Sequence, residues 1–184
     1  ARQAYRAFNA RLLAEETPDD DEIVLTSEKS YSNVFHANGG SASFSVMANT
    51  LRGVYGTDVL LATANSFTGS VLRADYNKKM AASMIMPNGL MSRQRTMTGA
   101  ELKETVRAFV EGCEGGFVPF NRGSLPVVSG IAVEVKEASG SYTLTGITRN
   151  GQPLKDDDTV TVTCLATENQ MEALLASGSG TPLA

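Results

Sequence analysis

The sequence has few of the residues that metal centres and catalytic sites usually need. Its 184 residues include one histidine, His36, and two cysteines, Cys113 and Cys164. A single histidine excludes any metal site or catalytic triad that takes two histidines from this chain. The cysteines are expected to be unpaired, partly buried thiols, with a disulfide as the alternative if the protein is secreted. His36 is expected in a loop.

Long apolar runs and an excess of positive charge are also missing. No apolar stretch reaches the roughly 18 residues of a membrane-spanning helix, so no membrane span is expected. The net charge of -4 leaves no basic footprint, so nucleic acid is not an expected partner. The chain starts with neither Met nor the features of a signal peptide, and it is expected to be a piece or a processed form of a longer protein.

The residues that are present fit one globular domain with an appendage at its start. Hydrophobic residues make up 42% and charged residues 20%, an ordinary balance. The stretch AYRAFNARLLAEE places four apolar side chains on one helical face: Tyr5, Phe8, Leu12 and Leu13. Pro18 and an acidic run end it. We therefore expect a connector helix and acidic turn over residues 1–21, and a domain over residues 22–184.

Helical and strand patterns alternate along that domain, which predicts an α+β fold with a mixed sheet covered by helices. Helices are predicted over 42–56, ending at Gly53 or Gly56, over 97–112 and over 168–177. Strands are predicted over 22–27, 57–64, 131–138, 141–151 and 158–164, and the last seven residues are expected to be a loose end. In the second helix Thr98 and Glu101 are spaced as a capping box.

Two groups of residues are expected to be structural. Asp156, Asp157 and Asp158 do not alternate as calcium ligands do, and no Glu closes the loop, so they predict a solvated turn between two strands. The other group consists of methionines expected to fill the core: Met80, Met84, Met86, Met91 and Met97.

Four stretches, taken in order, resemble the C-terminal domain of the 5'-nucleotidase and UDP-sugar hydrolase family in a divergent bacterial form. They are YGTDVLLATANS, TMTGAELKETV, LPVVSGIAVEV and TGITRNGQPLKDDDTVTVTC, and the resemblance covers roughly residues 22–172. It implies layered mixed β-sheets with helices. It also implies an extracellular, periplasmic or cell-surface protein, and an upstream metallophosphoesterase domain as partner of this one.

The resemblance implies recognition of a nucleotide or related phosphoester in nucleotide catabolism, with divalent metals held by the upstream domain. This chain has no D-x-H or G-N-H motif, so no catalytic residue and no cofactor or metal site is expected within it. The alternative is a non-catalytic surface binding module that has kept the fold and lost the nucleotide site.

The family's substrate-contacting residues match this sequence only in part. Asn65 stands where the family has the Asn of its N-G-G-x-x-R motif, but the nearest arginine, Arg73, is out of register. Asn88 replaces one base-stacking aromatic, and the second aromatic and the closing G-G-D-G motif are missing. The resemblance therefore implies a kept fold with an altered ligand set.

Three other stretches offer substitutes, each with a structural alternative. In GFVPFNRGS, Phe117 or Phe120 is a candidate stacking face, with Asn121 and Arg122 as polar contacts; the alternative is a surface loop with one buried Phe. NGGSAS before the first domain helix fits an anion site or an ordinary helix cap. In SRQRT, two arginines share one strand face and are otherwise simply exposed: Arg93 and Arg95.

Overall fold

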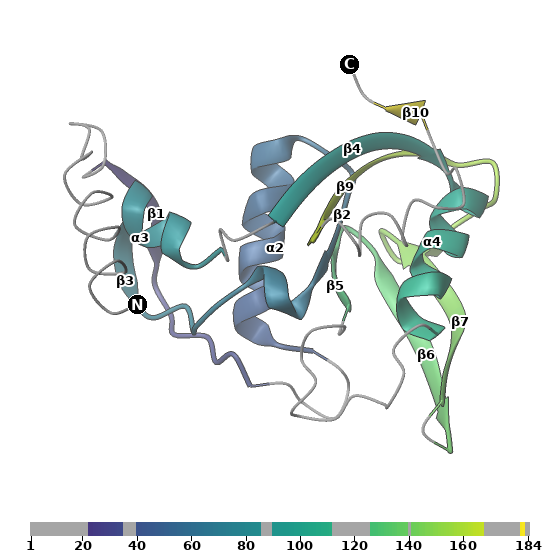
Figure 1. Cartoon of the computed structure of the whole chain (residues 1–184), viewed down its shortest axis with the longest axis horizontal. Coiled ribbons are helices and arrows are strands. Elements are labelled where there is room, and N and C mark those ends of the chain that lie inside the picture. The colour runs from purple at the N-terminus through teal and green to yellow at the C-terminus, as the bar shows by residue number, and fades with distance from the viewer. Residues whose placement is uncertain are drawn as a thin grey trace, which may run out of the picture.

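The fold is α+β, as predicted, with helices and β-sheets in layers (Figure 1). The computed structural model describes residues 22–34, 40–85, 90–111, 126–139, 141–167 and 181–182. The helices are α2 (Ala42–Tyr55), η2 (Ala64–Ser66), α3 (Lys78–Ser83) and α4 (Gly99–Glu111). The strands are β1 (Ile23–Ser27), β2 (Val59–Thr63), β3 (Ala74–Asn77), β4 (Leu90–Thr98), β5 (Pro126–Ser129), β6 (Ala132–Ala138), β7 (Ser141–Arg149), β8 (Gln152–Pro153), β9 (Thr159–Thr167) and β10 (Thr181–Pro182).

A five-stranded mixed sheet in the order β10-β4-β9-β2-β5 forms the centre. Strand β9 runs parallel to β2, from Val59 opposite Val162 to Ala62 opposite Leu165, and antiparallel to β4. Every residue of β2 is buried, because other strands pair on both sides and other elements cover both faces. This explains why its sequence, VLLAT, is a continuous apolar run rather than an alternating one.

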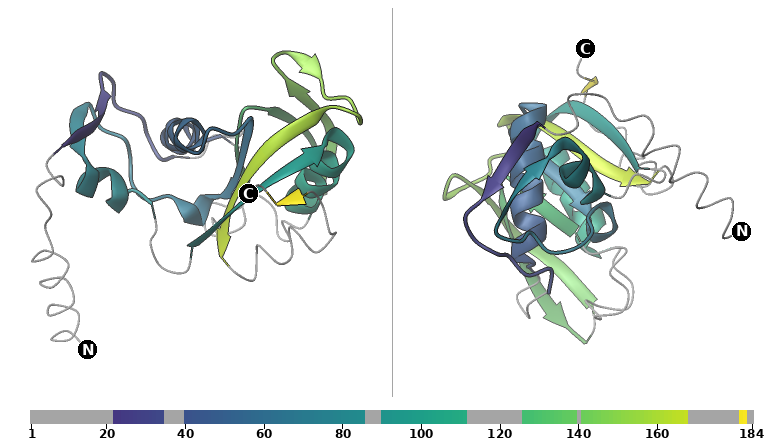
Figure 2. Two further views of the ribbon diagram at one scale, coloured as in Figure 1. Left: turned by 90° about the horizontal axis from the view of Figure 1, so that it is seen from above. Right: turned by 90° about the vertical axis from the view of Figure 1, so that its left-hand side faces the viewer.

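The two faces of this sheet pack into two separate cores. On one face, Leu61 and Val162 pack with Val106 of α4 and with residues of β7. On the other face, Leu60 packs with Phe44 of α2. Figure 2 shows α2 lying on one side of the sheet, with α4 and the β6-β7-β8 sheet on the other. The helix cover predicted from the sequence is therefore present on both faces.

Three elements differ from what the sequence predicted. The supposed loose C-terminal end contains β10, which pairs with Thr96 and Arg95 of β4. The alternating sequence of β6 is typical of a half-buried strand, but Val135 is 37% exposed, because the β6–β7 hairpin extends beyond the body of the protein (Figure 1). Met80 was expected in the core, yet it is 44% exposed on α3, a helix that the sequence did not predict.

Several other predictions can be compared only where the structure describes the chain. The helix over 42–56 is confirmed and ends at Gly56, whose φ of 65° is the left-handed conformation that glycine favours. Met84 and Met97 are buried as predicted, and Met91 is half-buried. The connector helix, the helix over 168–177, His36, Met86, Asn88 and Cys113 lie outside the described residues.

Candidate functional site

Four segments of the chain meet at one edge of the five-stranded sheet. The parallel strands β2 and β9 both end there, and β5 and β4 both begin there, with Thr63 opposite Pro126 and Leu90 opposite Thr167. We call this the carboxyl edge. Ligands of open α/β sheets bind outside the carboxyl ends of parallel strands, where loops can present side chains. The edge is therefore the first place to look for a binding site.

Asn65 lies at the carboxyl edge, directly after β2. Its side chain is exposed, while Thr63 and Ser66 on either side of it are buried. The Ser66 hydroxyl donates to the Leu165 carbonyl of β9 at 3.4 Å, and the Phe67 N–H donates to the Ala64 carbonyl at 3.2 Å. These bonds hold the short η2 turn against the sheet, so the Asn65 side chain is presented from a fixed backbone.

The other candidate contacts fall outside the described part of the chain. Phe117, Phe120, Asn121 and Arg122 belong to residues 112–125, after which the described chain resumes at Pro126 on the carboxyl edge. Their predicted roles therefore stay predictions. Asn65 is the predicted contact that the structure places.

The aromatic residue closest in sequence to Asn65 is not available to stack on a ligand. Phe67 is 4% exposed, and its ring packs on Phe44 of α2 with 5.6 Å between the ring centroids. Both rings belong to the core between α2 and the sheet. Phe67 is therefore not a substitute for the stacking aromatic that the resemblance implies at the position of Asn88.

The arginines singled out from the sequence lie in different places. Arg73 is exposed just before β3, and its backbone N–H donates to the Ser30 hydroxyl at 3.0 Å. It is therefore not part of the η2 turn that presents Asn65. Arg93 and Arg95 share a face of β4, as predicted; the first is exposed and the second half-buried. Arg93 donates to the Ser92 carbonyl at 3.2 Å.

The start of α2 is an ordinary capped helix. The Ser41 hydroxyl accepts from the Phe44 N–H at 3.4 Å, and the Ser43 N–H donates to the Ser32 carbonyl at 3.0 Å. The N–H groups of Ser43 and Phe44, which an anion at this helix start would need, therefore already donate hydrogen bonds within the protein. This favours the cap over the anion site at NGGSAS.

The three consecutive aspartates form a turn, as predicted, but the turn does not close a hairpin. It leads from β8 to β9 and so connects two different sheets. Backbone carbonyls of this turn accept hydrogen bonds from the first N–H groups of α4. The Gly99 N–H donates to the Asp158 carbonyl at 2.7 Å, and the Ala100 N–H donates to the Asp156 carbonyl at 3.1 Å. The hairpin turn itself is Asn150–Gly151, both with positive φ.

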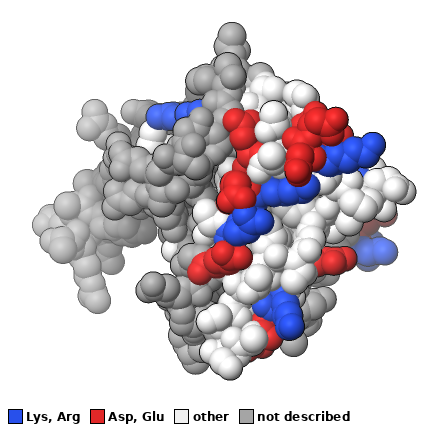
Figure 3. Space-filling model, turned by 90° about the vertical axis from the view of Figure 1, so that its right-hand side faces the viewer, with Lys and Arg blue, Asp and Glu red and all other residues white. Residues whose placement is uncertain are grey.

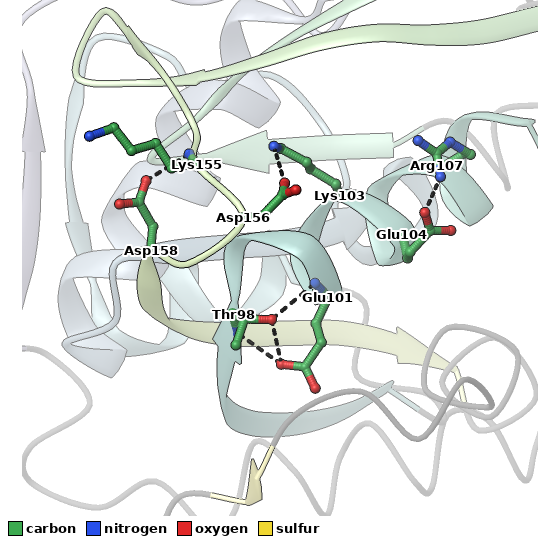
Figure 4. A network of polar contacts seen from close by, with 8 residues as sticks. All are labelled: Thr98, Glu101, Lys103, Glu104, Arg107, Lys155, Asp156 and Asp158. Carbon is green, nitrogen blue, oxygen red and sulfur yellow. Dashed lines mark hydrogen bonds and ion pairs between the residues drawn. The ribbon is translucent and has the colours of Figure 1, made fainter.

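Side chains around this turn complete a polar network (Figure 4). Thr98 and Glu101 form the predicted capping box, with the Glu101 N–H 3.2 Å from the Thr98 hydroxyl and the Thr98 N–H 2.7 Å from the Glu101 carboxylate. Lys103 pairs with Asp156 at 2.6 Å. Charges of both signs are interspersed on this side of the molecule (Figure 3). The aspartates therefore support a helix start, and a metal is not needed to explain them.

A second polar cluster, unnoticed in the sequence, lies at the opposite end of β2. Asp58 accepts hydrogen bonds from the Thr161 N–H and hydroxyl, both at 2.9 Å, and from Arg149 at 2.5 Å. Nearby, Arg52 of α2 donates to the Ser129 hydroxyl of β5 at 2.9 Å. We call this cluster the Asp58 junction, because it joins α2 to β5 and links β2, β7 and β9.

The environment of Asp58 favours its charged form. Partial burial acts against the charge, but the two hydrogen bonds from Thr161 and the positive charges of Arg149 and Arg52 outweigh it. The pKa of Asp58 is therefore lower than its ordinary value. Each of these partners is a residue of the protein's own helices and strands. The Asp58 junction therefore holds elements of the fold together and is not a candidate ligand site.

Cys164 is a free, buried thiol at the centre of β9. Burial raises its pKa to about 11, and the charge of Arg95 reduces that effect only in part. The prediction of a buried, unpaired thiol is confirmed for this cysteine. Among the described residues there is also no group of three or more His, Cys, Asp or Glu side chains able to hold a metal ion.

Comparison with known proteins yields matches in structure but not in sequence. No family model and no curated protein matches the chain. The NAD nucleotidase of Haemophilus influenzae matches with a TM-score of 0.63 and 19% identity, over 88% of this chain and 31% of that one. A 5'-nucleotidase precursor of Thermus thermophilus matches with a TM-score of 0.62 and 13% identity, over 99% and 36%. A sulfate thiohydrolase of Thermus thermophilus matches with a TM-score of 0.64 and 14% identity, over 99% and 33%.

The chain therefore has the layered α+β fold of a 5'-nucleotidase C-terminal domain, as the sequence resemblance predicted. At these identities the likeness shows the fold alone. The chain spans about a third of the length of the structures that it matches, as one domain of a larger protein would. Within the described residues, no helix is long and apolar enough to cross a membrane.

Proposed function

We propose that this chain is the substrate-recognition domain of a 5'-nucleotidase-like phosphoester hydrolase that acts in nucleotide catabolism outside the cytoplasm. The observation that carries the proposal is the carboxyl edge, where the exposed Asn65 follows a buried strand and three further segments of the chain converge. The catalytic divalent metals belong to a separate upstream domain. In this proposal the described residues of this chain contribute contacts to the substrate and no hydrolytic step.

Calorimetric titration of the chain with AMP tests this role. Asn65→Ala should weaken binding about threefold to tenfold, the effect of losing one ligand hydrogen bond. Gln152→Ala is the matched control, because it removes another exposed amide side chain, from β8, far from the carboxyl edge. Equal affinities for all three proteins would contradict a role for Asn65, and no binding of AMP would contradict the proposal itself.

A second candidate is a binding module that has kept the fold and lost the nucleotide site. The position of Phe67 favours it, because this ring packs in the core and cannot clamp a base at the edge. Ribose 5-phosphate distinguishes the two candidates when it is compared with AMP. Stacking of a base is worth about 1–3 kcal/mol, so a nucleotide site should bind AMP about tenfold to hundredfold more tightly. Equal affinities, or no binding of either compound, favour the second candidate, since neither result requires a site for the base.

A further inference from the structure

Strand β6 is an edge of the three-stranded sheet. Among the described residues it pairs with β7 on one side and with no strand on the other. The β6–β7 hairpin extends beyond the body of the protein (Figure 1), and six of the seven residues of β6 are exposed. An unpaired edge presents a row of backbone N–H and C=O groups, so it can pair with a strand of another chain.

The charges on β6 determine which strand this edge can accept. Its sequence, AVEVKEA, carries three exposed charged residues, and none of them forms an ion pair with another described residue: Glu134, Lys136 and Glu137. Charged residues on an edge usually prevent pairing, since like charges directly opposite each other repel. Pairing is favoured where the register places opposite charges across from each other.

A second copy of β6 meets this requirement. When two copies run antiparallel with Val135 opposite Val135, Glu134 of each copy lies opposite Lys136 of the other. Two pairs of opposite charge form in this way, one on each side of the two-fold axis. The remaining residues of the strand also find partners, and none of these pairs brings like charges together: Ala132 with Ala138, and Val133 with Glu137.

The neighbouring registers are less favourable. Centring the pairing on Glu134 or on Lys136 places identical charges opposite each other at the centre. Moving the centre half a residue from Val135 toward Lys136 places Glu134 opposite Glu137 in both halves. Moving it half a residue toward Glu134 forms no pair of opposite charges. The charge pattern therefore selects the register that is centred on Val135.

The same register improves the burial of Val135. Directly opposite residues of paired strands share a face, so Val133 and Val135 lie on the face of their partners Ile147 and Leu144, which belongs to the core under α4. Val135 is 37% exposed. A second β6 would place another valine beside it, with about 4.5–5.5 Å between the two Cβ atoms. The charged pairs would lie on the other face of the sheet.

We infer that two copies of this chain form a symmetric dimer by pairing their β6 strands about Val135. The two three-stranded sheets then become one continuous six-stranded sheet. Backbone hydrogen bonds supply the affinity of such strand pairing, and the alternating side chains supply its specificity. Seven residues on each side are fewer than the roughly 20–30 of a standard interface, so the dimer is weak and dissociates on dilution.

Sedimentation velocity of the whole chain, at protein concentrations up to about 0.5 mM, tests this pairing. Glu134→Lys places lysines opposite each other at both charge pairs, and Lys136→Glu does the same with glutamates. Each should weaken dimerisation about tenfold, because two attractive pairs become repulsive. An equimolar mixture of the two variants restores opposite charges at both pairs, so it should dimerise as strongly as the unmodified chain.

Glu28→Lys and Lys29→Glu are the matched controls. They make the same changes in net charge at exposed positions directly after β1, which belongs to a different sheet. Each should leave dimerisation unchanged, and mixing them should have no effect. The inference is overturned if the chain remains a monomer at every concentration. It is also overturned if the mixture of Glu134→Lys and Lys136→Glu dimerises no better than either variant alone, or if all variants dimerise equally, since another surface would then hold the dimer.

Discussion

Asp58 is the residue whose charge the structure uses most clearly. It accepts two hydrogen bonds from Thr161 and one from Arg149. Asp58→Asn removes the charge while keeping the size of the side chain. We expect it to lower the free energy of unfolding by about 1.5–3 kcal/mol, the range for hydrogen bonds to charged groups, as measured by urea denaturation at pH 7.

The same residue predicts a dependence of stability on pH. Because the pKa of Asp58 is lower in the folded protein than in the unfolded chain, the unfolded chain takes up the proton first as the pH falls. Its contribution is complete above the unfolded pKa of about 4 and is lost as the pH falls through the folded-state pKa. The stability difference between the unmodified protein and Asp58→Asn should shrink below pH 4; a constant difference would contradict this reading.

Cys164 provides a second prediction at the scale of one residue. Its thiol is buried, and a pKa of about 11 keeps it protonated at pH 8. We expect iodoacetamide to modify Cys164 only after unfolding, since the thiolate is the reactive form. Peptide mapping separates it from Cys113. Equal labelling rates in buffer and in urea would show that the site is accessible.

Among the secondary-structure elements, α4 has the best-defined start. Its first three N–H groups donate to the Asp158 carbonyl, the Asp156 carbonyl and the Thr98 hydroxyl. Thr98→Ala should destabilise the protein by about 1 kcal/mol, the usual effect of losing an N-cap. Glu101→Gln keeps an acceptor for the Thr98 N–H, and its effect on urea denaturation should be the smaller of the two.

Two glycines mark places where elements approach too closely for a side chain. A Cβ at Gly130, whose φ is +86°, would lie 2.0 Å from the Asp58 carbonyl oxygen, and one at Gly99 would lie 1.8 Å from the Lys155 carbonyl oxygen. We expect alanine at either position to destabilise the protein by about 2–4 kcal/mol.

Gly53→Ala is the matched control for these two glycines. Gly53 lies in α2, and nothing lies within 4 Å of an added Cβ there. Alanine should stabilise that helix by about 0.5–1 kcal/mol. If all three substitutions have the same effect on the melting temperature, close packing at Gly99 and Gly130 is not what requires glycine there.

At the scale of the whole molecule, most of the residues that carried the resemblance are structural, and Asn65 is the exception. Gly56 ends α2, Asp58 holds the junction, Gly99 and Gly130 permit close approaches, and Leu154 is buried in the core. None of them lies at the carboxyl edge. The motifs therefore predicted the fold well, and among the described residues Asn65 is their contribution to the candidate site.

The strongest local patterns allowed the sequence to predict α2, β2 and α4. The Asp58 junction was missed because its partners lie 91 and 103 residues away along the chain. Strand β10 was missed because two residues are too few for a periodic pattern. The turn at Asn150–Gly151 has a sequence signal, since Asn-Gly favours tight hairpins, but residues 141–151 were predicted as one strand and the turn was predicted at the aspartates.

The carboxyl edge is proposed as the place where this domain meets its ligand. Amide chemical shifts, followed by NMR while AMP is added to the chain, test that claim directly. We predict that shifts change at Thr63, Asn65 and Ser66 and not at the Asp58 junction. Changes centred on the junction or on the β6–β7 hairpin, with none at the carboxyl edge, would contradict the account.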